Sequence, residues 1–153
     1  MSIEYYMHQA LILANQASSQ DEIPVGCIIV NPINNEILAS THNLSHHSED
    51  ATAHAEILAI REACKKIGQN RLRGMDMYVT LEPCTMCAAA ISFARIQNLY
   101  FGAYDEKGGA VVNGVKFYDS QTCHHRPNIS GGHLEKECSN LLKEFFKNKR
   151  NKD

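Results

Sequence analysis

The sequence has few of the features that mark membrane proteins, secreted proteins or general nucleic-acid binders. No apolar run approaches the roughly 20 residues that a membrane-spanning helix needs. The first residues lack the basic stretch and apolar run of an export signal. A net charge of −2 and a pI near 6.4 argue against a broadly basic surface for nucleic acid. We therefore expect a cytoplasmic protein without a membrane anchor.

Linkers, repeats and low-complexity segments are also absent. The 153 residues are 44% hydrophobic, which is enough for one domain with a sizeable core over residues 1–153. Six cysteines would suit a disulfide framework in a small secreted chain, but this chain is larger and lacks an export signal. Cys27, Cys64 and Cys138 fall in apolar segments, so we expect them to be reduced core residues.

Two short motifs carry the residue types of a catalytic zinc site. The first is His54-Ala55-Glu56, and the second is Pro-Cys-Thr-Met-Cys at residues 83–87. One imidazole with the thiolates of Cys84 and Cys87 gives Zn²⁺ three protein ligands and leaves the fourth tetrahedral position to water, as in catalytic sites. The Glu56 carboxylate can move protons beside the metal. The alternative is a buried histidine, two inert core cysteines and a solvated acid at a helix start.

The first motif falls at a predicted helix start. An apolar stripe at helical spacing follows it and ends at Gly68, a typical stop signal. His54 and Glu56 are therefore expected in the first turn, with Asp50 or Thr52 as the capping residue.

The second motif follows a predicted buried strand and begins a second helix. Pro83 suits the first position of a helix, because it lacks the amide hydrogen that would be unpaired there. Cys84 and Cys87 are three residues apart and share one helical face. Helix N-termini favour thiolate over thiol, which prepares both sulfurs for a cation. Two helix starts are thus predicted to converge on one metal.

The remaining segments alternate between strand and helix patterns. We expect helices over residues 3–18 and 133–149 and strands over residues 25–30, 36–40, 77–81 and 99–104, with an irregular stretch before the last helix. This order predicts an α/β protein with a mixed sheet and helices on both faces. The last helix is expected to bury a stripe that includes Phe145 and Phe146.

With these motifs the chain resembles the zinc-dependent cytidine and deoxycytidylate deaminases, whose signature is H-x-E followed by P-C-x-x-C. Within that superfamily it is similar over nearly its whole length to the bacterial tRNA-specific adenosine deaminases. Further shared residues are Ile-Pro-Val-Gly at 23–26, Phe-Gly-Ala at 101–103 and the Phe-Phe pair at 145–146 before basic residues. The resemblance implies a three-layer α/β/α fold with a mixed, mostly five-stranded sheet, one zinc ion per subunit and a homodimer.

The resemblance also implies a reaction: hydrolytic deamination of adenosine to inosine at the wobble position of a tRNA anticodon, with the anticodon stem-loop of tRNA-Arg as the expected partner. Zinc-bound hydroxide would attack the ring carbon that bears the amino group, with Glu56 as the proton shuttle. One alternative is a deaminase of free guanine, cytosine or cytidine. Another is a binding module that zinc merely stabilises, in which the metal is fully ligated by protein.

Substrate residues follow from the resemblance, position by position. Asn43 matches an asparagine that hydrogen-bonds the target base or its ribose, Val25 a wall of the purine pocket, and Asp105 a position next to the anticodon backbone. Three basic residues match family residues near RNA: Lys147, Lys149 and Arg150. The alternative roles are a turn amide, a core valine, a loop carboxylate that caps the next segment, and a solvated charge run.

Residues 119–126 depart from the family pattern except for the trailing His125-Arg126. The run Cys123-His124-His125 would suggest a second metal site. Adjacent ligands wrap one ion poorly, so we expect none there.

Overall fold

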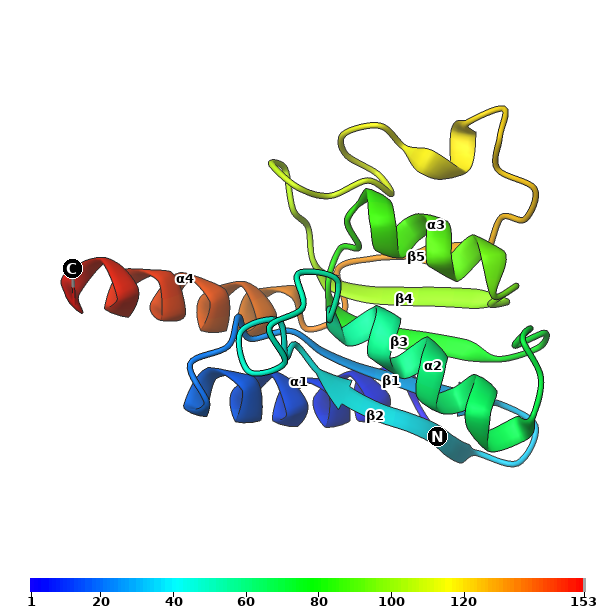
Figure 1. Ribbon diagram of the computed structural model, residues 1–153, viewed down its shortest axis with the longest axis horizontal. Coiled ribbons are helices and arrows are strands. Elements are labelled where there is room, and N and C mark those ends of the chain that lie inside the picture. The colour runs from blue at the N-terminus through cyan, green and yellow to red at the C-terminus, as the bar shows by residue number, and fades with distance from the viewer. Residues whose placement is uncertain (153) are drawn as a thin grey trace.

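The middle layer of the protein is a five-stranded mixed sheet (Figure 1). The computed structural model describes the backbone of residues 1–152 and the side chains of residues 1–150. The strands are β1 (Gly26–Asn31), β2 (Glu36–His42), β3 (Asp76–Leu81), β4 (Asn98–Ala103) and β5 (Asn128–Ser130), in the order β2-β1-β3-β4-β5. β1 is antiparallel to both β2 and β3, whereas β3, β4 and β5 run parallel. The predicted mixed sheet is confirmed.

Helices cover both faces of this sheet (Figure 1). One face carries α1 (Ile3–Ser19) and α4 (Glu135–Lys152). The other carries α2 (Ala55–Ile67) and α3 (Thr85–Phe93), with the short 3₁₀ turn η1 (Phe117–Asp119) against α3. The three-layer α/β/α arrangement is therefore confirmed. In the described part of the chain, no helix combines the length and apolarity needed to cross a membrane.

Strand β1 contributes side chains to two hydrophobic cores. Cys27 and Ile29 belong to the larger cluster, which includes residues of α2 and α3. Ile28 and Val30 belong to the smaller cluster, which includes residues of α1. This alternation follows from the two-residue period of a strand. A strand covered on both faces must be apolar throughout, which explains the continuous apolar run in the sequence.

Both zinc-motif helices begin later than predicted. His54 is the residue that immediately precedes α2, in an extended conformation with ψ 152°. Cys84 holds the same position before α3, so Pro83 lies outside that helix. Neither Asp50 nor Thr52 caps α2, because the Asp50 carboxylate instead accepts bonds from the amide and hydroxyl of Thr52. The predicted stop is confirmed, since α2 ends before a left-handed glycine at residue 68.

The C-terminal third differs from prediction in three places. β5 lies in the stretch expected to be irregular, because three largely exposed residues give no apolar pattern. α4 begins after Leu134, whose positive φ of 53° breaks the helix that we predicted from His133. Phe145 is buried as expected, but Phe146 is 42% exposed. The end of α4 extends beyond the sheet, so its outer side has no layer to pack against (Figure 1).

Candidate active site

Two helix starts bring the three predicted zinc ligands together. The Nδ1 atom of His54 lies 3.7 Å from the Sγ of Cys84 and 3.6 Å from the Sγ of Cys87. All three ligand atoms lie within 4.8 Å of one another. Tetrahedral zinc, with bonds of about 2.0 Å to nitrogen and 2.3 Å to sulfur, holds such atoms about 3.6 Å apart. The geometry of the donor set therefore fits a zinc ion.

The charges of the two sulfurs also fit a cation. A hydrogen bond from Cys87 lowers the pKa of the Cys84 thiol to about 4. The same hydrogen bond, with burial and the charge of Glu56, raises the pKa of Cys87 above its usual range. Two sulfurs this close thus share a single negative charge unless a cation lies between them. Zinc removes the proton from a coordinating thiol outright, so it would let both sulfurs be thiolates.

Glu56 is placed to handle protons beside these ligands. It lies in the first turn of α2 and is only 4% exposed. Burial, together with the Cys84 charge, raises the pKa of its carboxyl to about 7. A side chain that is almost fully buried is not a solvated helix-start acid, so that alternative is wrong.

Asn43 connects β2 to the start of α2. Its Oδ1 accepts a hydrogen bond of 2.8 Å from the backbone N–H of Ala55, the first residue of that helix. His54 provides no side-chain cap of its own, so Asn43, the residue after β2, caps the helix. Because a backbone N–H can only donate, the bonded atom must be the oxygen, and the Nδ2 amino group is left as a donor for the pocket.

The zinc ligands open into a pocket of 170 Å³. Its lining includes the predicted residues Val25, Asn43 and Asp105, together with Glu56 and two of the ligands. The sequence interpretation missed Ile23, Ser45, Leu81, Glu82 and Gly108, which also line it. Apolar strand ends carry no signal of their own at sequence level. The side chains that close a pocket become visible only when the strands are paired.

Glu82 anchors the loop that forms one wall of this pocket. Its buried carboxylate accepts five hydrogen bonds: from the backbone of Asp105, from three N–H groups of residues 111–113, and from the Asn113 side chain. Burial raises its pKa, but these bonds outweigh burial and the pKa is lowered. The loop approaches closely because Gly109 has no Cβ, which would lie 2.5 Å from the Glu82 carboxyl carbon. An acid directly before Pro83-Cys84 was the available signal.

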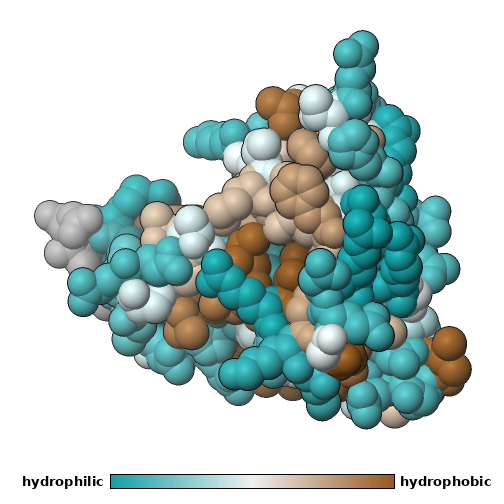
Figure 2. Space-filling model, turned by 45° about the vertical axis from the view of Figure 1, so that its right-hand side comes forward, coloured by the Kyte–Doolittle hydropathy of each residue, from teal (hydrophilic) through white to brown (hydrophobic). Residues whose placement is uncertain are grey.

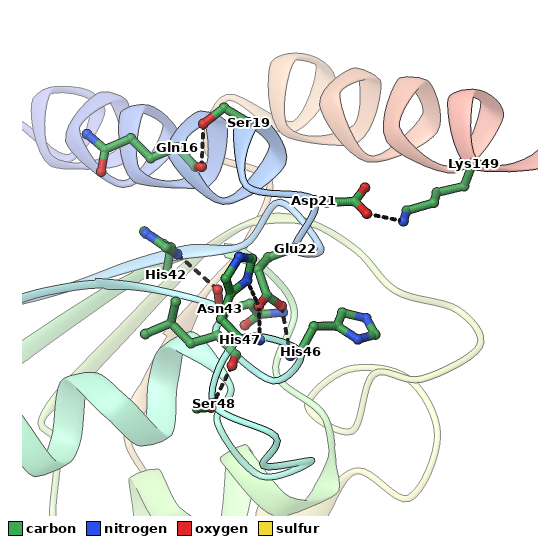
Figure 3. A network of polar contacts seen from close by, with 11 residues as sticks. Gln16, Ser19, Asp21, Glu22, His42, Asn43, His46, His47, Ser48 and Lys149 are labelled. Carbon is green, nitrogen blue, oxygen red and sulfur yellow. Dashed lines mark hydrogen bonds and ion pairs between the residues drawn. The ribbon is translucent and has the colours of Figure 1, made fainter. Parts of the chain in front are cut away.

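Glu22 anchors a second loop at the pocket. Its side chain is fully buried and accepts the backbone N–H groups of His46 and His47 and a bond from the His47 ring at 2.6 Å. Figure 3 shows the His47 ring turned toward Glu22, whereas the His46 ring points away and only its backbone reaches the carboxylate. The adjoining Ser45 lines the pocket. Both walls of the pocket thus depend on buried carboxylates.

Asp105 has a structural role in addition to lining the pocket. Its Oδ1 accepts the backbone N–H groups of Lys107 and Gly108, which closes a turn. The alternative of a capping loop carboxylate is therefore supported, while its backbone N–H binds Glu82.

A groove of 840 Å³ adjoins the pocket and shares Ile23, Leu81, Asp105 and Gly108 with it. α4 forms one side of the groove, and the residues after β4 form the other. Figure 2 shows apolar surface exposed in a hollow beside the C-terminal helix.

Of the three predicted basic residues, only Arg150 lines the groove. Lys149 instead forms an ion pair of 2.6 Å with Asp21 (Figure 3). Its ammonium group also lies over the ring of Phe145. Lys147 is exposed and lines none of the hollows described here.

Within the described residues, the one group of potential metal ligands is His54, Cys84 and Cys87, and the run Cys123-His124-His125 is not part of it. The His125 ring binds the backbone oxygen of Ile96, and Cys123 lies against Ser92. All six cysteines are free, and Cys27 and Cys138 are buried as predicted, whereas Cys64 is only partly buried.

Comparison with known proteins agrees with this site. A family model described as the cytidine and deoxycytidylate deaminase zinc-binding region matches residues 1–103. The chain is 51% identical over 146 residues to the tRNA-specific adenosine deaminase of Agrobacterium fabrum, which covers 95% of each chain. It is 42% identical over 149 residues to that of Bacillus subtilis, covering 97% of this chain and 91% of the relative.

Solved structures give the same result. A structure from a study of A-to-I editing by tRNA:A34 deaminases at the wobble position superposes with a TM-score of 0.87 and 51% identity, covering 90% of this chain and 99% of that one. A guanine deaminase of Bacillus subtilis is 37% identical, with a TM-score of 0.64 over 68% of this chain and 66% of that one. The chain belongs to the zinc-binding cytidine and deoxycytidylate deaminase family, and within it to the group of tRNA-specific adenosine deaminases.

Proposed function

We propose that this protein hydrolyses adenosine to inosine at the wobble position of a tRNA anticodon. The observation that carries this proposal is the continuity of the site: a three-ligand metal group and a buried acid lie in a pocket that opens into a groove large enough for more than one nucleotide. Relatives named tRNA-specific adenosine deaminases, at 42–51% identity over at least 92% of this chain, support the same reaction.

The chemistry follows from the residues of the pocket. Zinc held by His54, Cys84 and Cys87 would supply a Lewis acid that makes water nucleophilic near neutral pH. Glu56 accepts a proton from the attacking water and delivers it to the ring nitrogen beside the amino-bearing carbon. A second transfer protonates the departing amine, so adenosine and water become inosine and ammonia. The Nδ2 group of Asn43 donates a hydrogen bond to the substrate, which orients the ring.

The groove supports RNA as the substrate. It is lined by two exposed aromatic rings, Tyr104 and Phe146, on which unpaired bases can stack. Lys107, Lys143 and Arg150 add positive charge along it. A free base would fill only the pocket and would not need this groove. Lys147 and Lys149 remain RNA contacts by resemblance alone.

A homodimer and a cytoplasmic location belong to the same proposal. Exposed apolar residues support an interface: Phe93 at the end of α3, and Val112 and Val115 in the segment that leads to η1. Sedimentation equilibrium of the zinc-loaded protein at micromolar concentration tests this point, and a monomer would remove the dimer from the proposal.

The decisive experiment compares substrates. Zinc-loaded protein is incubated with tRNA-Arg transcript, its anticodon stem-loop, free adenosine, guanine, cytosine and cytidine, and inosine and ammonia are measured. We expect turnover of the two RNAs, with inosine at the wobble position only. Turnover of a free base without turnover of RNA would contradict the proposal and favour the guanine deaminase to which the chain is also similar.

A further inference from the structure

A second hollow lies at the opposite edge of the sheet from the zinc site. β3, β4 and β5 are parallel, so the loops that enter these strands meet at one edge, and the loops that leave them meet at the other. Cys84 and Asp105 follow β3 and β4, whereas Arg73, Arg95 and Arg126 precede β3, β4 and β5. A six-residue strand is about 20 Å long, so the two edges are separate sites.

The entering loops enclose a hollow of 320 Å³. This volume is at the lower end of the range for small-molecule sites. Six side chains around it can donate hydrogen bonds: Arg73, Arg95, Arg126, His125, Gln97 and Asn128. No carboxylate lines the hollow. Three guanidinium groups around one concavity repel one another in the absence of an anion.

Two of these side chains are held in place by the backbone of the loops. The Nη1 of Arg95 donates to the backbone oxygen of Ser92 at 2.8 Å, and Arg95 itself has a φ of 64°, a left-handed conformation that is costly for a residue with a Cβ. The His125 Nε2 lies 2.7 Å from the carbonyl oxygen of Ile96, and must donate, because a carbonyl only accepts. Such preorganisation lowers the entropy cost of binding.

The other two guanidinium groups are available to a ligand. Arg73 makes no side-chain hydrogen bond or ion pair with any other residue that the structure describes. Arg126 lies 3.3 Å from Asp119, but both side chains are more than half exposed, so the pair is weak and replaceable. Asp76 at the start of β3 accepts a hydrogen bond from the Asn98 side chain and does not line the hollow. The positive charge of the hollow is thus only weakly compensated, by one exposed ion pair.

We propose that this hollow binds a phosphate group. Guanidinium groups bind phosphate oxygens through paired, charge-assisted hydrogen bonds, which a tetrahedral oxyanion offers to several donors at once. The phosphate can belong to a free nucleotide or to an RNA backbone, and both present the same oxygens. The site goes beyond the proposed deamination, since it lies at the other edge of the sheet and needs no reaction at the zinc.

Titration calorimetry of the zinc-loaded protein with inorganic phosphate and with ADP tests the site. We compare wild type with R73Q/R126Q, which removes the two exposed guanidinium groups, and with K65Q/R71Q, a charge-matched control whose exposed residues lie outside the hollow. We expect saturable binding that is at least about tenfold weaker in R73Q/R126Q and within about twofold of wild type in the control.

A second experiment distinguishes a phosphate of a free nucleotide from a phosphate of an RNA backbone. It measures binding of the anticodon stem-loop and of whole tRNA at several salt concentrations. If the phosphate belongs to RNA, the slope of log affinity against log salt becomes shallower in R73Q/R126Q. The change exceeds that in the control by roughly 1–2. If it belongs to a nucleotide, the binding of phosphate and ADP weakens in R73Q/R126Q, whereas RNA binding is the same as in the control. Equal effects of the two double variants on phosphate, ADP and RNA would overturn the site.

Two further measurements separate loss of the phosphate site from loss of folding and from loss of deamination. Thermal unfolding verifies that each variant folds, and phosphate should raise the melting temperature of wild type and control but not of R73Q/R126Q. None of these measurements uses deamination, so failure of the phosphate site and failure of the proposed function give different results.

Discussion

Glu56 and Glu22 are both buried carboxylates near the pocket, but their surroundings shift the pKa in opposite directions. Burial dominates at Glu56 and raises its pKa to about 7. At Glu22, burial also raises the pKa, but hydrogen bonds from His47 and His46 outweigh it and the pKa is lowered. One acid can therefore exchange protons near neutral pH, while the other remains a charged anchor.

Replacing Glu56 with glutamine tests its role as the proton carrier. The amide keeps the shape of the side chain but cannot accept and release a proton. We expect deamination of the anticodon stem-loop to fall by about 10²–10⁴-fold. Zinc content, measured by elemental analysis, should remain at one per chain. Near-normal turnover in this variant would exclude Glu56 from the mechanism.

Glu22 gives a prediction for the pH dependence of stability. Its folded pKa lies below the ordinary value of 4.5, so its contribution is complete above that value and is lost as the pH falls through the folded pKa. Glu22→Gln should therefore lower the free energy of unfolding by about 1–3 kcal/mol at pH 7. The difference from wild type should shrink in acid. Urea unfolding between pH 3 and pH 7 measures the free-energy difference between the two proteins and its change with pH. A difference that grows in acid would contradict the role of Glu22 as a charged anchor.

At the scale of elements, the loop between β4 and η1 depends on a residue outside it. Glu82→Gln replaces one acceptor oxygen by an amino group that faces backbone donors, so the loop of residues 105–113 should loosen. We expect a higher KM for the anticodon stem-loop with zinc retained. The matched control is Glu36→Gln, an exposed acid of β2 that lines neither the pocket nor the groove. Equal KM values for the two variants would show that the anchor does not matter for substrate.

α4 gives a second prediction at this scale. Arg150 lines the groove, whereas Lys136 is exposed near the start of the same helix and does not. Arg150→Gln should weaken tRNA binding and reduce the slope of log affinity against log salt by about 0.7–0.9, the value for one phosphate contact. Lys136→Gln should change neither. Filter binding between 50 and 300 mM salt, roughly the range in which such slopes are measured, provides the test. The same slope in both variants would show that α4 is only solvated.

For the whole molecule, zinc couples the two helix starts on one side of the sheet. Removal of zinc with a chelator should abolish deamination and lower the melting temperature. Loss of a ligand at 100 times its Kd costs about 2.7 kcal/mol, which corresponds to about 5–10 °C for a chain of this size. One equivalent of zinc should restore both. The Glu56→Gln protein should show the same thermal shift without activity. Full activity in metal-free protein would refute the site.

Much of this architecture follows from local sequence. Continuous apolar runs predict strands covered on both faces, and β1 and β3 are such strands. The spacing of His54, Cys84 and Cys87 predicts the ligand set, because only certain residue types at helix starts suit zinc. The predicted caps were wrong, since the side-chain hydrogen bond to the start of α2 comes from Asn43, which follows β2. That residues 1–153 form one domain stays a prediction.

The sequence alone therefore determined the chemistry: one imidazole, two thiolates and an acid at fixed offsets, together with the order of the helices and of the first four strands. Only the tertiary structure decided what surrounds that chemistry. Glu22 and Glu82 anchor loops that lie 24 and 23 or more residues away along the chain, and the basic hollow gathers residues from the starts of three strands. Such contacts depend on how the strands pair and in which direction they run. Local sequence patterns do not encode this pairing, so they cannot show which distant side chains meet.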